Sequence, residues 1–283
     1  MTTQNTRALD CTGLVKTFGG VTVVKSVDFT VPAGHVVGLI GENGAGKSTL
    51  SSMIAGIHQP DGGSMTLDGE DYAPGSPSEA LNQGVALIHQ EIRMVPHLSV
   101  AENIFLGRLP MKGGRVDRAS MYEQTAAVLG TLGVDIDPRR SILGLSTAQQ
   151  QSIEIAKSIL RSPRYVIFDE PSASLTAAET DRVLHQIAVL RDSGVGVVYI
   201  SHRLEEVREI SSDIVCMRDG AVVKTWPTGN IPTDELVQAM VGRDFTFAHQ
   251  APKPSREDIV LSVSGLGRKG ARSEEHTSEL QSR

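Results

Sequence analysis

Residues 36–50 read VVGLIGENGAGKSTL, an apolar run that leads into a glycine-rich loop and then into residues that favour a helix. Within it, Gly41, Gly46, Lys47 and Ser48 match the template G-x-x-x-x-G-K-[ST]. Glycines let consecutive backbone N–H groups point at one anion, and the following helix adds its positive end. The stretch predicts a phosphate-binding loop between a strand and a helix of an α/β fold. The alternative is a plain glycine-rich turn.

The loop supplies most of the predicted ligand contacts. Lys47 is expected to reach the terminal phosphates as a point charge, and the Ser48 hydroxyl to bind Mg²⁺. The pattern therefore predicts a nucleotide's phosphates and Mg²⁺ as the ligands. The predicted nucleotide-binding residues of the loop are Gly41, Glu42, Asn43, Gly44, Ala45, Gly46, Lys47, Ser48 and Thr49.

Composition limits the classes of protein that fit. The 283 residues are 40% hydrophobic and 21% charged, as in a globular protein of one large or two modest domains. The net charge of −6 argues against a nucleic-acid partner. Cys11 and Cys216 lie too far apart in sequence for metal spacing and favour buried positions in a reducing compartment. No apolar run has the length of a membrane span, and the N-terminus lacks a signal-peptide core.

Polar side chains follow three further strand-like runs. Asp169 and Glu170 end the run from Tyr165, Gln90 follows Val85–Ile88, and His202 follows Gly196–Ile200. Ligands bind at the carboxyl ends of strands in open α/β sheets. We expect Asp169 to hold Mg²⁺ through water and Glu170 to polarise the attacking water. Gln90 is expected to meet that water or the Mg²⁺, and His202 to contact the γ-phosphate. Alone, each would be an ordinary strand end, loop polar group or structural histidine.

The remaining pattern predicts the elements around these residues. Phe18, before Gly19-Gly20, is either a stacking partner for a nucleotide base or a core residue. Pro96 to about Arg161 is predicted to be helical, with a capping box at Ser99 and Glu102 and a long helix capped by Ser146. The other predictions are strands at Ala8–Phe18, Val21–Val31 and Met65–Leu67, a first helix ending near Ile57, a capping box at Thr176 and Glu179, a hairpin over Asp213–Trp226 and a helix over Thr233–Val241.

Taken in order, Phe18, GENGAGKST, Gln90, LSTAQ, YVIFDE and ISHR resemble the nucleotide-binding domain of ABC transporters over residues 8 to about 245. The runs IHQEIRMVPHLSVAENIFLGR, LSTAQQQSIEIAKSIL, ISHRLEEV and MVGRD most resemble the ATPases of bacterial monosaccharide importers. The resemblance implies a P-loop NTPase fold with a RecA-like core, an antiparallel β subdomain and an inserted α-helical subdomain at about 96–161. It implies adenine stacking for Phe18, a general base in Glu170 and a switch histidine in His202.

Two departures from the family pattern stand out. The family consensus LSGGQ is here Leu145, Ser146, Thr147, Ala148 and Gln149, and in the family this signature segment caps the ATP held by the other half of a dimer. Side chains in place of glycines predict a weaker cap. Thr176 stands where many relatives have aspartate. Both departures resemble the N-terminal, catalytic half of sugar-importer ATPases that carry two nucleotide-binding domains in one chain.

The resemblance implies an ATPase that powers monosaccharide import from the cytoplasmic face of the membrane. Its implied partners are membrane permease subunits, a second nucleotide-binding half and, indirectly, an extracytoplasmic sugar-binding protein. One alternative is a soluble ABC ATPase that acts on ribosomes or DNA without transport. Another is a fragment that binds ATP and hydrolyses it poorly alone.

The C-terminal region carries three further expectations. Residues 246–257 are predicted to be a linker, and residues 258–271 the start of a second nucleotide-binding domain, because IVLSVSGL echoes LDCTGL near the N-terminus. Residues 272–283 resemble the translation of a common sequencing adapter and are predicted to be an artefact, with an ordinary polar tail as the alternative.

Overall fold

The computed structural model describes residues 7–89, 94–227 and 231–242. The chain divides into two units, Met1–Asp244 and Phe245–Arg283, and every described residue belongs to the first. The described strands are β1 (Ala8–Phe18), β2 (Val21–Pro32), β3 (Val36–Ile40), β4 (Gly62–Leu67), β5 (Glu70–Asp71), β6 (Val85–Ile88), β7 (Met111–Lys112), β8 (Arg115–Val116), β9 (Tyr165–Asp169), β10 (Gly196–Ile200), β11 (Asp213–Arg218) and β12 (Ala221–Pro227). The described helices are α1 (Lys47–Ile54), α2 (Pro77–Asn82), α3 (Val100–Ile104), α4 (Arg118–Thr131), α5 (Thr147–Ile159), α6 (Ala177–Asp192), α7 (Leu204–Ile210) and α8 (Thr233–Val241).

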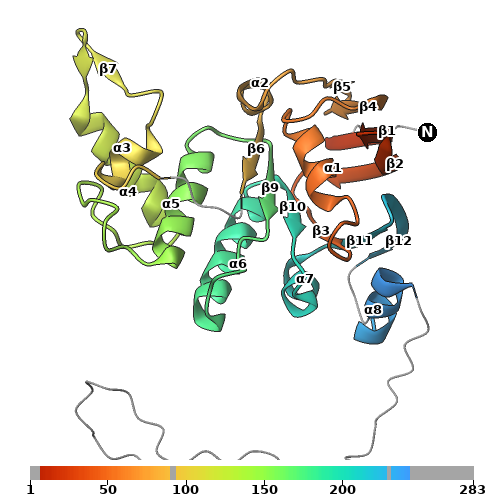
Figure 1. Cartoon of the computed structure of the whole chain (residues 1–283). Helices are drawn as coiled ribbons and strands as arrows, with labels where there is room; N and C mark the ends of the chain where they lie inside the picture. The colour runs from red at the N-terminus through yellow and green to blue at the C-terminus, as the bar shows by residue number, and fades with distance from the viewer. Residues whose placement is uncertain (1–6, 90–93, 228–230, 243–283) are drawn as a thin grey trace, which may run out of the picture. The chain divides into compact units, whose positions relative to one another are not determined.

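A six-stranded sheet carries the predicted site (Figure 1). Its strand order is β12-β11-β3-β10-β9-β6. The strands from β11 to β6 pair in parallel, and β12 is antiparallel to β11. All five parallel strands therefore end at the same edge. The predicted functional residues that the structure describes follow β3, β9 and β10, so the topology directs them to that edge.

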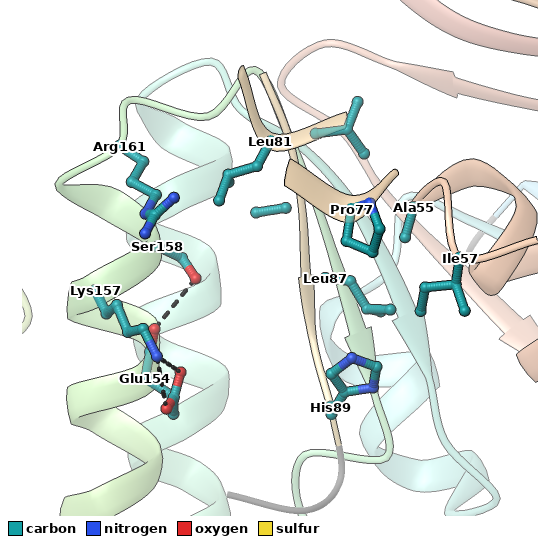
Figure 2. Close-up of a pocket in the computed structure, with 12 residues that line it drawn as sticks. Ala55, Ile57, Pro77, Leu81, Leu87, His89, Glu154, Lys157, Ser158 and Arg161 are labelled. Atoms are coloured by element: carbon teal, nitrogen blue, oxygen red, sulfur yellow. Dashed lines mark hydrogen bonds and ion pairs between the residues drawn. The ribbon is translucent and has the colours of Figure 1, made fainter. Parts of the chain in front are cut away.

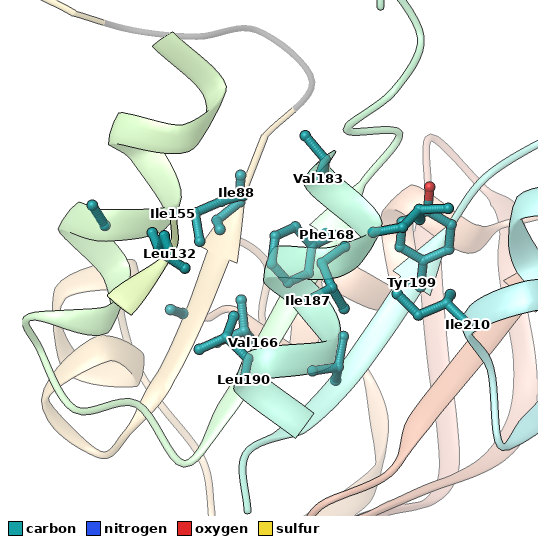
Figure 3. Packing of buried hydrophobic residues seen from close by; sticks show 14 of the residues in the cluster. Ile88, Leu132, Ile155, Val166, Phe168, Val183, Ile187, Leu190, Tyr199 and Ile210 are labelled. Atoms are coloured by element: carbon teal, nitrogen blue, oxygen red, sulfur yellow. The ribbon is translucent and has the colours of Figure 1, made fainter. Parts of the chain in front are cut away.

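The central strands are buried on both faces, as expected for parallel strands covered on two sides. In β9, Val166 and Phe168 belong to one hydrophobic cluster, and Tyr165 and Ile167 to another. The first cluster joins the sheet to α3 through α7, and Figure 3 shows Phe168 among side chains that include Ile187. The second joins the sheet to α1 and the N-terminal strands. Helices α1 and α5 therefore pack on opposite faces of the sheet.

A second, four-stranded sheet has the order β2-β1-β4-β5 with every pair antiparallel. Gly19 and Gly20 have φ values of 55° and 83°, which lets Phe18 and Val21 pair directly across a two-residue turn. This sheet is the antiparallel β subdomain implied by the family resemblance.

The block predicted to be helical contains α3, α4 and α5, but it is not helical throughout. Between α3 and α4 the chain forms a two-stranded hairpin, in which Met111 pairs with Val116 and Lys112 with Arg115. Gly113 and Gly114 have φ values of 58° and 76°, a pair of left-handed residues that suits a tight hairpin turn. The hairpin therefore interrupts the block that the sequence pattern predicts to be helical, because two left-handed glycines favour a tight turn over a helix.

One helix boundary and one further helix also differ from the prediction. Helix α1 ends at Ile54 instead of near Ile57, and the left-handed Gly56 follows it. A Cβ on Gly56 would lie 2.7 Å from the Ser76 carbonyl oxygen, so the chain turns here in close contact with another segment. Helix α2 was not predicted, although Ser76 caps it and Pro77 opens it.

The predicted caps and the C-terminal hairpin are confirmed. Ser99 with Glu102, Ser146 with Gln149 and Thr176 with Glu179 each form a capping box. Strands β11 and β12 turn at Asp219-Gly220, where both residues are left-handed. Cys11 and Cys216 are buried free thiols. Among the helices that the structure describes, none is long and apolar enough to cross a membrane.

Candidate active site

The glycine loop joins β3 to α1, as predicted. Gly46 has a φ of 100° and directly precedes the first helical residue, Lys47. A Cβ on Gly41 would lie 2.2 Å from the Met217 carbonyl oxygen, and one on Gly46 would lie 3.0 Å from the Val23 carbonyl oxygen. The backbone of β2 and β11 therefore packs closely against the loop. Only glycine fits Gly41 without moving the backbone, which accounts for that position of the template.

Lys47 is folded into the loop. Its ammonium nitrogen donates hydrogen bonds to the carbonyl oxygens of Gly41 at 2.7 Å and Glu42 at 3.0 Å, and the residue is 7% exposed. Burial lowers the pKa of Lys47, while the nearby carboxylates of Glu170 and Asp169 act in the opposite direction. The structure therefore gathers the lysine and both carboxylates, which lie over 120 positions apart in the sequence.

Asp169 is the last residue of β9 and lies beside the loop. Burial raises its pKa, and the neighbouring charge of Glu170 adds to that shift. A hydrogen bond from the Ser48 side chain and the charges of His89 and Lys47 act against it. The two residues predicted on the metal side, Ser48 and Asp169, are thus in contact.

Glu170 and His202 form a pair across the ends of β9 and β10. His202 Nδ1 lies 3.1 Å from Glu170 Oε2, although the residues are 32 positions apart. Glu170 has a left-handed φ of 50°, and its backbone N–H donates to the Ile200 carbonyl oxygen at 2.9 Å. A glutamate in this conformation is strained, and strain of this kind is frequent at functional sites. The structure therefore brings these two predicted residues into contact.

Phe18 is 41% exposed, at the end of β1. Its ring centroid lies 5.1 Å from that of His58 in an edge-on arrangement, and the Lys16 ammonium nitrogen lies 5.5 Å from the ring centroid. The alternative of a core phenylalanine does not fit this exposure. A role in base stacking stays a prediction, as does the role of Gln90, which lies outside the described residues.

The predicted signature segment lies at the start of α5. Ser146 Oγ accepts a hydrogen bond from the Gln149 N–H at 3.2 Å, and Gln149 Oε1 accepts one from the Ser146 N–H at 3.0 Å. Leu145 and Ala148 are buried in the core, whereas Thr147 is exposed. Of the two residues that replace glycine, Thr147 alone presents its side chain on the surface. The segment packs on the opposite face of the sheet from the helix that follows the loop.

Comparison with known proteins agrees with this geometry. Residues 24–173 match the family described as ABC transporter. The chain is 46% identical over 262 residues to a ribose import ATP-binding protein of Rubrobacter xylanophilus. This match covers 91% of this chain and 50% of that protein. It is 39% identical over 267 residues to a galactose/methyl galactoside import ATP-binding protein of Clostridium tetani. This match covers 93% of this chain and 53% of that protein. The chain spans about half the length of the curated relatives it matches.

Solved structures confirm the fold. An ATP-binding cassette of an ABC transporter in its ADP conformation superimposes with a TM-score of 0.73 at 24% identity, covering 84% of this chain and 99% of that one. A nucleotide-free cassette gives a TM-score of 0.71 at 22% identity, covering 84% and 96%. With the family match over residues 24–173 and the assembled loop, carboxylates and histidine, the chain belongs to the ABC transporter family.

Proposed function

We propose that this chain is the ATP-binding and ATP-hydrolysing half of the subunit that energises import of a monosaccharide. One observation carries the proposal. The loop lysine Lys47, the Ser48–Asp169 contact and the Glu170–His202 pair converge at the carboxyl ends of β3, β9 and β10. This set combines a phosphate-binding cation, oxygen donors for a metal and a base beside a histidine, which is what hydrolysis of a phosphoanhydride requires.

The donor set suits ATP with Mg²⁺. Mg²⁺ prefers oxygen ligands and usually takes one or two from protein carboxylates, with phosphate oxygens and water for the rest. The Ser48 hydroxyl and the Asp169 carboxylate are such donors and already lie in contact. When bound, Mg²⁺ would neutralise charge on the phosphates. The Lys47 ammonium donates to the carbonyl oxygens of Gly41 and Glu42, and phosphate oxygens would replace these carbonyls as its acceptors.

The chain's own residues account for the hydrolytic step. Glu170 is the general base that orients and polarises the attacking water. His202 holds one oxygen of Glu170 through Nδ1, which fixes the direction in which the other oxygen points. Lys47 and the loop N–H groups stabilise the negative charge that develops on the phosphates. Phe18 provides an exposed ring on which adenine stacks.

The transport part of the proposal follows the relatives, which are named as ribose or galactose import ATP-binding proteins. We assign the chain to the cytoplasmic face of the membrane, with permease subunits and a second nucleotide-binding half as partners. An extracytoplasmic sugar-binding protein would deliver the substrate. The coverage of half of each relative supports the need for a second half.

A pocket of about 280 Å³ supports a permease contact through the helical block. Figure 2 shows Leu87 on β6 and His89 just after it, with Ala55, Ile57 and Pro77 to one side and Lys157 on α5 to the other. The pocket thus joins the sheet to α5 beside the strand that leads to Gln90. A permease segment seated here would touch the sheet and the helical block together, so movement of one relative to the other would reach the membrane.

The test is ATP binding and hydrolysis by the purified chain. Activity is measured with Mg²⁺, with and without a separately expressed C-terminal half of the Rubrobacter xylanophilus relative. We expect hydrolysis that rises on adding this half and is lost in Glu170→Gln, while Glu170→Gln still binds ATP. Co-sedimentation with membranes that carry the permease tests the location. A folded chain that binds no ATP refutes the proposal.

A further inference from the structure

A buried carboxylate, Glu206, lies in α7 and gathers four side chains. The residue is 8% exposed. Its Oε2 accepts hydrogen bonds from Ser172 Oγ at 2.5 Å, Tyr199 OH at 2.8 Å and Ser201 Oγ at 3.2 Å. Its Oε1 accepts a bond from Arg203 Nη1 at 3.0 Å. Glu206 lies within the run ISHRLEEV, which carries the family resemblance without giving this residue a role, and the arrangement is independent of the glycine loop.

The network connects the two loops that carry the catalytic pair. Ser172 stands two residues after Glu170, and Ser201 directly precedes His202. One carboxylate oxygen therefore holds both loops, each within two residues of a catalytic side chain. Ser201 Oγ also accepts a bond from the Arg203 N–H at 3.0 Å, so the same hydroxyl fixes the start of α7.

The chemistry of the network requires a carboxylate. Three hydroxyls donate to Glu206, and an ionised carboxylate is a pure acceptor that can receive all of them. A glutamine at this position would have one acceptor oxygen, and its NH₂ group would face the donors of Arg203 or the hydroxyls. A buried polar group without a partner is costly, so the hydroxyls would be expected to turn away and the loops to move.

Tyr199 anchors the network to the core. Its ring lies within the first hydrophobic cluster, where Figure 3 shows it near Ile210. Burial raises the pKa of Tyr199, so the phenol keeps its proton and its role as donor at neutral pH. The carboxylate thus has one rigid donor from the core and two from loops, which makes it a fixed point for both loops.

We propose that Glu206 is a positioning residue for hydrolysis, which holds the loops after β9 and β10 so that Glu170 and His202 keep their 3.1 Å contact. This inference rests on the proposed ATPase function. Glu206 does not touch the phosphate-binding residues of the loop, so its effect is on the rate of hydrolysis and not on nucleotide affinity.

The experiment compares Glu206→Gln with Glu205→Gln in the full 283-residue chain. Glu205 is the exposed neighbour in the same helix, so its change removes the same charge without touching the network. Amide hydrogen exchange is measured in the absence of nucleotide. The kcat and KM for ATP hydrolysis are measured with Mg²⁺ and with the C-terminal half added. In Glu206→Gln we expect exchange in residues 170–176 and 200–204 to rise about 10-fold. The expected fall in kcat is about 10- to 100-fold with KM unchanged, since a displaced catalytic group costs about this much.

Each outcome decides the inference. Equal exchange of these segments in the two variants overturns it, and so does faster exchange throughout the domain, which would mean a general stabilising role. If Glu206→Gln does not fold, Ser172→Ala takes its place, because it keeps the carboxylate and removes one of its hydrogen bonds. The inference then requires faster exchange confined to residues 170–176. If the unmodified chain hydrolyses no ATP even with the second half, the proposed function fails, while the exchange data still decide whether Glu206 holds the two loops.

Discussion

Asp68 joins the antiparallel sheet to the six-stranded sheet through two side-chain contacts. We predict that removing its carboxylate lowers the free energy of unfolding of the domain measurably. Asp68 lies in the turn between β4 and β5 with a left-handed φ of 54°. Its Oδ1 accepts a hydrogen bond from Tyr165 OH at 2.7 Å, and its Oδ2 pairs with Arg164 Nη1 at 2.6 Å. Both partners lie at the start of β9, nearly 100 positions later in the chain.

The magnitude for Asp68→Ala follows from three losses. Tyr165 is 1% exposed, so its hydroxyl would lose its partner in the interior, at a cost of about 1–3 kcal/mol. Alanine at a left-handed φ costs about 1–2 kcal/mol, where aspartate is better tolerated. The side chain of Arg164 is 42% exposed, so solvent screens the ion pair and its loss adds only about 0.5 kcal/mol. We expect a net loss near 3 kcal/mol, or about 6–12 °C in Tm for a domain of this size.

The assay is urea and thermal unfolding of the purified chain, with Asp68→Asn as the matched control. Asparagine tolerates the left-handed turn and keeps an acceptor for Tyr165, so this variant should lose about 1 kcal/mol or less. In the double variant with Tyr165→Phe, the cost of Asp68→Ala should shrink by about 1 kcal/mol or more. Equal costs for alanine and asparagine, or full additivity with Tyr165→Phe, would show that the Tyr165 hydrogen bond does not hold the two sheets.

Three further predictions concern the site. Phe18→Ala should weaken ATP binding by about 1–3 kcal/mol with little effect on Tm, because the exposed ring offers stacking and not core packing; a fluorescent ATP analogue measures this, and unchanged affinity would exclude stacking. Gly41→Ala should lower Tm more than Gly44→Ala, since a Cβ on Gly41 meets the Met217 carbonyl oxygen at 2.2 Å and one on Gly44 meets nothing within 4 Å; similar Tm values would contradict the tight packing. The raised pKa of Asp169 means that the nucleotide-free fold binds its proton more tightly than the unfolded chain does, so this residue's contribution to stability is lost as pH rises through the folded pKa. Asp169→Asn should therefore be more stable than the unmodified chain at neutral pH without Mg²⁺ or nucleotide, with the difference fading in acid; urea unfolding from pH 4 to 7 checks the sign.

The parts of the site that depend on local sequence could be predicted. The loop template needs glycines at fixed offsets before a helix, and Gly41, Lys47 and Ser48 lie where that rule puts them. The residues that follow strands, Asp169 and His202, could be placed because parallel strands end at one edge of a sheet. The capping boxes at Ser99 and Thr176 could be predicted because the two partners of a box stand three residues apart.

The elements that were missed depended on weak or ambiguous local signals. The Gly113-Gly114 pair is typical of a hairpin turn, but its flanking strands are two residues each and lie within a stretch that otherwise favours helix. Helix α2 is only six residues long, too short for a periodic pattern to show. Its signals were limited to the cap at Ser76 and the proline that follows.

The contacts that Asp68 and Glu206 make to distant strands had no signal in the local sequence, and this limits what a sequence can reveal about a site of this kind. Asp68 meets Tyr165 because the two sheets pack together, and Glu206 meets Ser172 because β9 and β10 are neighbours in one sheet. Serine, tyrosine and aspartate at such positions are ordinary in any chain, and their pairing becomes visible only in three dimensions. A motif identifies the side chains that touch the phosphates, because their spacing is set by one loop. The residues that hold those side chains in place come from several loops, so the structure is needed to find them.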